Sequence, residues 1–288
     1  MVEKGKVTVA LIQHSCSTSY RENIKKAKIM IREAAKKGAK MICLQELFAG
    51  RYFPQFIDVA KYDLAEPVPG PITADFQPLA RELGVVLLVP VYEYVMDGIY
   101  FNTVAVFDAD GTYLGKYRKN HIPEGPQYIE KYYFTPGDLG YPVFNTRYGK
   151  VGVLICWDEW FPEASRIVAL KGADIVFYPS AIGSEQDNPD LDTSEPWMTA
   201  IRAHGICNNM YVAAVNRVGL EDEMSFYGRS FISGPWGEIL AESTVKEDMI
   251  IMATCDFSEI KRSRDVLQFH RDRRVDTYRA ILKKVIEE

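Results

Sequence analysis

The chain has 288 residues, of which 47% are apolar and 25% are charged, and its formal net charge is -5 at pH 7. This length and composition allow one large hydrophobic core, or two modest ones, without disulfides. The negative charge argues against nucleic-acid binding, which usually depends on a basic patch that neutralises phosphates. The start, MVEKGKVTVA, has no apolar signal core, and the longest apolar runs are far shorter than a membrane span. These features predict a cytoplasmic protein with neither nucleic acid nor membrane as a partner.

Predicted strands and helices alternate in the first half of the chain. In order, the pattern predicts a strand over 7–14, an amphipathic helix over 23–39 closed by Gly38, a buried strand over 41–47, a helix near 73–83 and the apolar strand VVLLVPVYEY. Two hairpins follow. FNTVAVFDADGTYLGKYRK turns at Asp110-Gly111, and FNTRYGKVGVLICWD turns at Tyr148-Gly149.

The second half repeats this alternation. A helix over about 162–171 leads into the strand DIVFYPSA, and a helix over 196–208 leads into the strand MYVAAVNRVG. The segments SFISGPWGEILAES and MIIMATCDF close the pattern. Such a mixture requires helices layered on sheets rather than a simple parallel barrel.

Cysteine usage separates one residue from the other four. The five cysteines are widely spaced, with neither a CxxC pair nor a nearby His pair at zinc-ligand spacing, which predicts neither a disulfide framework nor a metal site. We expect Cys16, Cys43, Cys207 and Cys255 to be small buried apolar residues. Cys156 differs, because the polar residues of WDEWFPE crowd it on one side.

Three polar residues fall at or near the carboxyl ends of predicted strands. Glu46 follows MICLQ, Lys119 follows TYLGKYR, and Cys156 follows GVLI. In open α/β sheets, ligands bind at this edge, because side chains from separate strands converge there. Each residue alone would more often be solvated or salt-bridged, so the prediction depends on the three occurring together.

Together, these residues suit acyl transfer. A thiol is mostly protonated at neutral pH, so a Cys nucleophile needs a base or a neighbouring cation. Glu46 can remove the proton, and Lys119 together with the backbone N–H of Trp157 can stabilise the oxyanion. Only four His residues are present, and His121, close to Lys119, is expected to shape the pocket rather than to act as a base.

These segments resemble the nitrilase superfamily of carbon–nitrogen hydrolases. The resemblance rests on LQELFAGRYF, YRKNHIPEGPQYIEKYYFTPGD and GVLICWDEWFPE, and it extends in order and spacing over about 7–258. It implies an α/β fold, a four-layer αββα sandwich in a single domain over 1–288, with a C-terminal extension over 259–288 at a dimer interface. It also implies a homodimer or a larger homo-oligomer. It also implies a Glu46–Lys119–Cys156 triad, with Glu130 positioning the Lys and the substrate, and no cofactor or metal.

Within the superfamily, CWDEWFPE and FYPSAIGSE resemble the N-carbamoylputrescine amidohydrolases. The resemblance implies hydrolysis of a small-molecule ureido amine to putrescine, CO2 and ammonia in polyamine biosynthesis. N-Carbamoyl amino acid hydrolases and β-ureidopropionases are the alternatives, and these should present Arg to a substrate carboxylate. A non-catalytic binding subunit of the same fold is a further alternative, which the complete triad disfavours.

The acidic loop over 181–196 bears on this choice. It contains no Lys or Arg, and it follows a predicted strand, where it would reach the pocket rim. Glu185, and after it Asp187, are the candidates for binding a distal ammonium group, although a solvated acidic loop explains the composition equally well. Tyr52 and Trp157 are expected to line an apolar channel, with an ordinary core role as the alternative.

Overall fold

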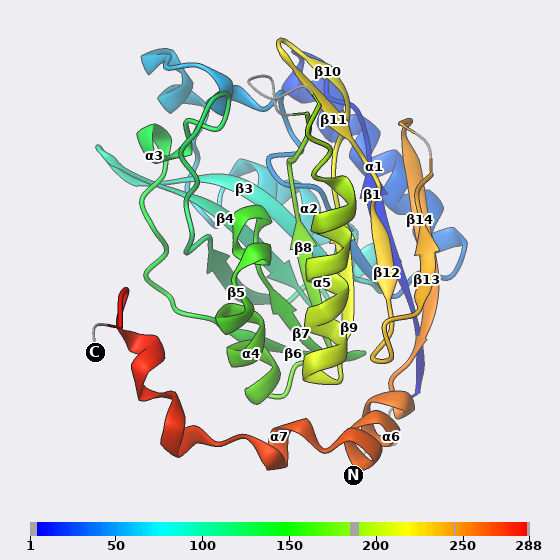
Figure 1. Cartoon of the computed structure of the whole chain (residues 1–288). Coiled ribbons are helices and arrows are strands. Elements are labelled where there is room, and N and C mark those ends of the chain that lie inside the picture. The colour runs from blue at the N-terminus through cyan, green and yellow to red at the C-terminus, as the bar shows by residue number, and fades with distance from the viewer. Residues whose placement is uncertain (1–4, 185–189, 245, 287–288) are drawn as a thin grey trace.

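The computed structural model describes residues 5–184, 190–244 and 246–286. Two six-stranded mixed sheets form its centre (Figure 1). The first sheet has the order β14 (Met249–Asp256), β1 (Lys6–Gln13), β2 (Met41–Leu44), β3 (Val86–Met96), β4 (Ile99–Phe107) and β5 (Tyr113–Arg118). The second has the order β13 (Ile239–Glu242), β12 (Phe231–Ser233), β9 (Tyr211–Val215), β8 (Ile175–Pro179), β7 (Gly149–Val153) and β6 (Val143–Thr146).

Each sheet has three parallel strands at its centre and antiparallel strands at its edges. β1, β2 and β3 are parallel in the first sheet, and β7, β8 and β9 are parallel in the second. The carboxyl ends of each parallel set therefore lie on one edge of its sheet. Both predicted hairpins are confirmed as the antiparallel pairs β4–β5 and β6–β7.

Helices cover the outer faces and complete the predicted αββα sandwich (Figure 1). α1 (Tyr20–Lys36) and α2 (Pro71–Leu83) pack on the first sheet, and α4 (Pro162–Leu170) and α5 (Ser194–Asn208) pack on the second. α1 begins three residues before the predicted start, because the Ser19 hydroxyl accepts a hydrogen bond from the Glu22 N–H and caps the helix. Among the helices described, none is long and apolar enough to cross a membrane.

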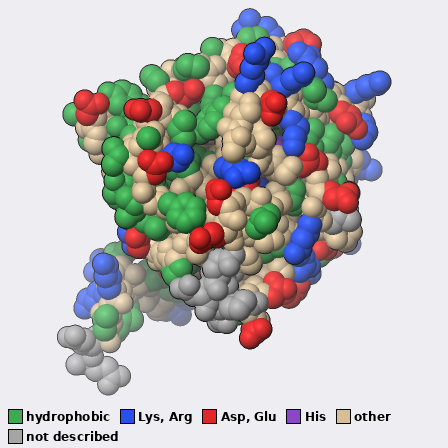
Figure 2. Space-filling view, turned by 90° about the horizontal axis from the view of Figure 1, so that it is seen from above, with side chains coloured by type: hydrophobic (Ala, Val, Ile, Leu, Met, Phe, Trp, Pro, Cys, Tyr) green, Lys and Arg blue, Asp and Glu red, His purple; other side chains and the backbone are tan. Residues whose placement is uncertain are grey.

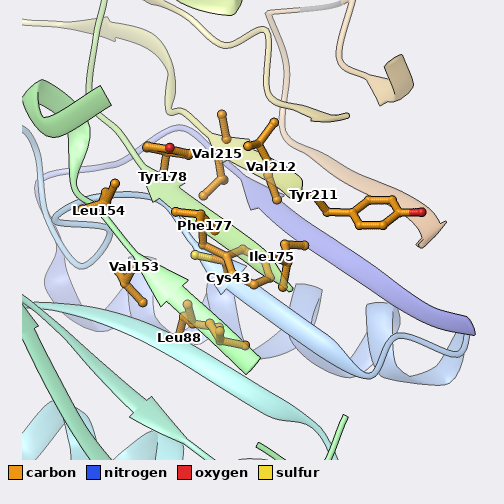
Figure 3. Close-up of a cluster of buried hydrophobic side chains, with 14 of the residues drawn as sticks. Cys43, Leu88, Val153, Leu154, Ile175, Phe177, Tyr178, Tyr211, Val212 and Val215 are labelled. Carbon is orange, nitrogen blue, oxygen red and sulfur yellow. The ribbon is translucent and has the colours of Figure 1, made fainter. Parts of the chain in front are cut away.

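The main core lies between the two sheets. β1 follows the period of two expected of a strand: Val7, Val9 and Leu11 face the second sheet, whereas Ala10 and Ile12 face the helices. Figure 3 shows Cys43 and Leu88 of the first sheet beside side chains of the second. The second-sheet side chains labelled there are Val153, Leu154, Ile175, Phe177, Tyr178, Tyr211, Val212 and Val215.

Two predictions about this core are wrong. MYVAAVNRVG is not one strand but splits into β9 and β10 (Val218–Glu221), and β10 pairs with β11 (Met224–Tyr227) in a separate hairpin. The split falls at Asn216 and Arg217, whose side chains bond to backbone elsewhere. Cys207, expected to be buried, is exposed on α5.

The remaining elements lie around the two sheets. α3 (Glu130–Tyr133) and three short 3-10 helices, η1 (Phe53–Gln55), η2 (Val59–Leu64) and η3 (Cys156–Trp160), lie in the connections. The C-terminal segment forms α6 (Ser258–Leu267), α7 (Phe269–Asp272) and η4 (Val275–Leu282), and it runs along the outside of the molecule (Figure 1).

Candidate functional site

The three predicted catalytic residues lie just after the ends of three strands. Lys119 directly follows β5, Glu46 follows the end of β2, and Cys156 follows β7 as the first residue of η3. β2 stops at Leu44, earlier than the predicted strand over 41–47, so Glu46 lies in a turn. The polar residues are therefore placed at strand ends by the geometry of the sheets, as the pattern of polar residues after apolar runs indicated.

Glu46, Lys119 and Glu130 form one fully buried cluster. The Lys119 Nζ donates to Glu46 Oε1 at 2.9 Å and to Glu130 Oε2 at 2.6 Å, and none of the three side chains has exposed surface. Burial opposes the charged form of Lys119, but the charges of Glu130 and Glu46 outweigh it and raise the pKa well above its ordinary value. Lys119 is therefore a fixed cation held by two carboxyl groups.

Two neighbours orient the carboxyl groups of this cluster. The Tyr52 hydroxyl donates to Glu130 Oε1 at 2.7 Å, and the Asn102 amide on β4 donates to Glu46 Oε1 at 2.6 Å. Glu46 Oε2 is buried and has no hydrogen-bond partner among the described residues. That oxygen is left to accept a proton.

Cys156 occupies a strained turn. Its φ is 44°, in the left-handed region that a residue with a side chain rarely adopts. The residue is 4% exposed, and its Sγ lies 3.9 Å from the carbonyl oxygen of Ala181 at the end of the neighbouring strand β8. The turn directs the sulfur away from the strand and toward the space between the strand ends.

Asp158 holds that turn. Its carboxylate accepts hydrogen bonds from the Ile155 N–H at 2.9 Å and from the Tyr117 hydroxyl at 2.6 Å. It also bonds to the backbone N–H of His121 at 2.9 Å and to its Nδ1 at 2.7 Å. The imidazole stacks on Phe161 with ring centroids 3.8 Å apart. His121 is thus bonded to the turn that carries Cys156, and among the described residues no hydrogen bond joins its side chain to Glu46 or Lys119.

The electrostatics of Cys156 favour a neutral thiol at rest. Burial raises the pKa of the thiol well above its ordinary value, the charge of Glu46 raises it further, and Lys119 opposes both. A preformed thiolate is therefore disfavoured, and the sulfur needs a base that takes its proton during attack. The free oxygen of Glu46 suits that task.

Burial brings the pKa values of two carboxyl groups, Glu130 and Glu159, close to neutral pH. Burial raises the pKa of Glu130 to about 7, with Lys119 opposing the change. Burial raises the pKa of Glu159 to about 8, with the hydrogen bond from Ser180 opposing the change. The Ser180 hydroxyl lies 2.8 Å from Glu159 Oε2. Glu130 and Glu159 therefore carry less than their full negative charge beside the thiol at pH 7.

The remaining predicted site residues differ in their surroundings. Trp157 is 40% exposed, and its ring contacts Trp160 and Phe161. Tyr52 is fully buried, and its hydroxyl is occupied by Glu130. Glu185 and Asp187 lie outside the described residues.

A cavity of about 540 Å³ opens beside the end of β8. Its lining includes Ser184, Asp190, Asp192, Tyr227 and Arg229, but none of Glu46, Lys119 or Cys156. The described part of the acidic loop therefore borders a cavity close to the strand that contacts the Cys156 sulfur.

Reasoning from the sequence missed Asn102, Glu159, Arg217 and Glu221. Asn102 and Arg217 each interrupt an apolar strand pattern, in FNTVAVF and VAAVNRVG, and a buried polar residue in such a run requires a partner. The sequence therefore indicated that Asn102 and Arg217 need hydrogen-bond partners. Those partners lie far away in the sequence, and only the fold identifies them.

Comparison with known proteins agrees with this geometry. The family described as Carbon-nitrogen hydrolase matches residues 8–265. The chain is 46% identical to N-carbamoylputrescine amidase of Solanum lycopersicum, over 98% of this chain and 97% of that one. It is 42% identical to citrullinase of Francisella tularensis subsp. tularensis, over 96% and 99% of the two chains. A crystal structure of a carbon-nitrogen hydrolase from Helicobacter pylori G27 superposes with a TM-score of 0.93 and 38% identity, covering 98% of this chain and all of that one.

The match spans nearly the whole chain, and the cluster of Glu46, Lys119 and Glu130 lies within electrostatic range of the Cys156 thiol. The chain therefore belongs to the carbon–nitrogen hydrolase family and is a hydrolase that acts on amide-type bonds.

Proposed function

We propose that this protein hydrolyses N-carbamoylputrescine to putrescine, CO2 and ammonia, with Cys156 as the nucleophile. The observation that carries the proposal is the buried pair of Lys119 and Glu46, in which Glu46 keeps one unpartnered oxygen and both charges act on the Cys156 thiol. The identity shared with the tomato N-carbamoylputrescine amidase supports the choice of substrate.

The reaction begins with proton transfer from the Cys156 thiol to Glu46 Oε2 as the sulfur attacks the ureido carbon. A carbon–sulfur bond forms, and the carbonyl oxygen gains the negative charge that the Lys119 ammonium and the Trp157 backbone N–H stabilise. Glu46 then gives its proton to the terminal nitrogen, the carbon–nitrogen bond breaks, and ammonia leaves. Glu130, held by Tyr52, keeps Lys119 in position throughout.

The second half of the reaction releases the amine. Glu46 removes a proton from water, and the resulting hydroxide attacks the thiocarbamate carbon. The carbon–sulfur bond breaks, and the Cys156 sulfur recovers its proton from Glu46. The carbamate that is released decomposes to CO2 and putrescine.

Charge around the site supports an amine rather than a carboxylate at the distal end of the substrate. Lys119 is bound by two carboxyl groups, Arg217 is bound by Glu221, and Arg51 is bound by Asp222 at 3.0 Å. A substrate carboxylate would have to compete with protein carboxylates for each of these cations. On the face shown in Figure 2, acidic and basic side chains are similarly intermingled. Glu185 and Asp187 are our candidates for binding the distal ammonium group.

L-Citrulline is the second candidate substrate, because the chain is 42% identical to a citrullinase. Citrulline carries the same ureido group but ends in an α-amino group and a carboxylate. The two compounds therefore test the distal end of the pocket and leave the reacting end unchanged.

Ammonia release from N-carbamoylputrescine, L-citrulline and N-carbamoyl-β-alanine will test the proposal, with Cys156→Ala as the control for contaminating activity. We expect kcat/KM for N-carbamoylputrescine to exceed the other two by about 10²-fold, because a misplaced charge at a buried pocket end is strongly disfavoured. A preference for either carboxylate-bearing compound would make the polyamine assignment wrong. Activity that persists in Cys156→Ala would contradict the nucleophile.

We also propose that two copies pair through the C-terminal segment over 259–288 and that the enzyme works in the cytoplasm. This segment exposes a series of apolar side chains, which in a folded protein commonly marks an interaction surface. These are Val275, Tyr278, Ile281, Leu282, Val285 and Ile286. Light scattering should give twice the chain mass of 32.7 kDa, and the double variant Ile281→Asp, Leu282→Asp should give the mass of a single chain.

A further inference from the structure

A buried guanidinium holds the loop that carries Glu46. Arg217 lies between β9 and β10 and has no exposed surface. Its Nη2 donates to the backbone carbonyls of Glu46 at 2.8 Å and Leu47 at 3.0 Å, and its Nη1 lies 3.3 Å from the carbonyl of Gly50. One side chain from the second half of the molecule thus bonds to three carbonyl groups in a five-residue stretch of the first half.

Glu221 completes this contact. Its two carboxylate oxygens lie 2.9 and 2.7 Å from Arg217 Nη1, and Oε2 also accepts a hydrogen bond from the Tyr52 backbone N–H at 2.6 Å. Burial opposes the charge on Arg217, but Glu221 outweighs it, so the pKa of the guanidinium is raised and the group stays charged. The pair therefore binds both ends of the loop over 46–52.

The loop itself needs such support. Leu47 has a φ of 49°, a left-handed conformation that a branched side chain rarely adopts and that persists only where the surroundings impose it. In this conformation the carbonyl groups of Glu46 and Leu47 both reach the same Arg217 nitrogen. Without the guanidinium, the carbonyl groups of Glu46, Leu47 and Gly50 would each lose a hydrogen bond.

These contacts join the site into a closed ring. Arg217 binds the Glu46 backbone, and the Glu46 side chain binds Lys119. Lys119 binds Glu130, which accepts the Tyr52 hydroxyl, and the Tyr52 backbone returns to Glu221 and so to Arg217. Each buried polar group in the ring is placed by the next, so a displacement at Arg217 moves both the base and the residue that holds Glu130.

We propose that Arg217 and Glu221 are positioning residues for the hydrolysis, because they hold the loop over 46–52 in the conformation that places the Glu46 carboxylate between Lys119 and Cys156. The inference rests on the proposed chemistry of Glu46 and Cys156. Neither Arg217 nor Glu221 touches the reacting atoms, and their effect passes through the backbone of residues 46–52.

Arg217→Lys and Glu221→Gln test this inference. Lysine keeps the charge but not the planar fork that reaches several carbonyl groups. Arg202→Lys is the control, because the Arg202 guanidinium on α5 also donates to backbone, to the Gly237 carbonyl at 3.1 and 2.8 Å, away from the site. Circular dichroism and thermal unfolding show which variants are folded, and Glu221→Gln carries the test if Arg217→Lys does not fold.

We expect kcat of Arg217→Lys to fall by about 10²-fold with KM changed by less than about threefold, because small misplacements of a catalytic group have effects of that size. Glu221→Gln should lose about tenfold, since it leaves the guanidinium in place. Arg202→Lys should keep its kcat even where its thermal stability falls. A folded Arg217→Lys variant with kcat within about twofold of the parent would overturn the inference.

A second readout does not depend on the substrate. Alkylation of Cys156 by iodoacetamide, followed by mass spectrometry in a Cys207→Ser background that removes the exposed thiol, reports how readily the thiol loses its proton. In Arg217→Lys the alkylation rate should fall and its pH profile should move to higher pH. If the parent does not hydrolyse N-carbamoylputrescine but the profile moves, the substrate is wrong and the positioning role stands. An unchanged profile in the folded variant contradicts the role.

Discussion

Arg118 and Lys119 are neighbours in the chain, yet they bind two different buried carboxyl clusters. The outer cluster consists of the buried Glu93 and the two cations that bind it, Lys116 and Arg118, of which Arg118 also pairs with the exposed Asp138. The inner cluster consists of Lys119 and the two buried carboxyl groups that bind it, Glu46 and Glu130. Successive side chains at the end of a strand point to opposite faces of the sheet, which separates the two clusters. Both clusters contain buried ion pairs at short range, but their ratios of cation to carboxylate differ.

That ratio decides the state of the carboxyl groups. In the outer cluster two cations serve one carboxylate: burial opposes the charge on Glu93, but the hydrogen bonds from Arg118, Lys116 and Thr103 lower its pKa below the ordinary value. In the inner cluster one cation serves two carboxyl groups, and burial raises the pKa of Glu130 to about 7. Where cations outnumber carboxylates, the carboxylate stays charged and stabilises the fold. Where carboxyl groups outnumber cations, one carboxyl group can exchange a proton near neutral pH.

The strongest test of this difference is to remove each cation in turn. Lys119→Met should lower kcat/KM by about 10²- to 10³-fold, because it removes a donor to the oxyanion and leaves two buried carboxyl groups without their cation. Arg118→Met should leave kcat/KM within about threefold of the parent. It should instead lower the free energy of unfolding by about 2 kcal/mol, since two hydrogen bonds to Glu93 are lost. Steady-state kinetics and urea unfolding measure both effects.

The separation would be wrong if Arg118→Met lost as much activity as Lys119→Met at equal folded fraction. Such a result would mean that the outer cluster also positions the reacting groups, and that the ratio of charges does not distinguish structure from chemistry.

A smaller effect is expected from the carboxyl group whose pKa is about 7. Glu130→Gln should lower kcat by about 10²-fold, because the amide no longer holds the Lys119 ammonium. The parent should lose kcat/KM as the pH falls below about 7, where Glu130 gains a proton and Lys119 loses one of its two anionic partners. In Glu130→Gln this loss of kcat/KM below about pH 7 should be absent. Glu163→Gln, at an exposed position on α4, is the control. If Glu130→Gln still loses kcat/KM near pH 7, another group causes the loss.

The smallest effects concern stability, and they should have opposite signs. The lowered pKa of Glu93 contributes stability that is present above its unfolded value and is lost as the pH falls through the folded value. Glu93→Gln should therefore cost about 2 kcal/mol at pH 7 and progressively less toward acid pH. The pKa of Glu159 is raised from 4.5 to about 8, so the folded state holds a proton that the unfolded chain releases, and stability is lost as the pH rises across this range.

Glu159→Gln removes that loss, because glutamine is neutral at every pH and can still accept the hydrogen bond from Ser180. Relative to the parent, the variant should gain more than about 1.4 kcal/mol between pH 5 and pH 8. Urea unfolding at the two pH values measures both variants. If the two substitutions change stability with the same pH dependence, the opposite signs expected for Glu93 and Glu159 are wrong.

Much of the fold could be predicted from local pattern. The alternation of Val7, Val9 and Leu11 with Ala10 and Ile12, and the turn residues Asp110 and Gly111, specify strands and a hairpin whatever the rest of the chain does. Where prediction failed, a tertiary contact was responsible. MYVAAVNRVG has the composition of one strand, but Asn216 and Arg217 bond to distant backbone and divide it.

The sequence by itself determined that polar residues follow apolar strands at Glu46, Lys119 and Cys156, because strand length and the placement of polar residues are local properties. It did not determine which charges meet. The pairing of Glu130 with both Lys119 and Tyr52, and of Arg217 with the Glu46 loop, depends on bringing together segments up to 171 residues apart. Burial then decides the chemistry: a carboxyl group is an ordinary anion in water, and enclosure in the fold raises the pKa of Glu130 to about 7 although Lys119 opposes the change.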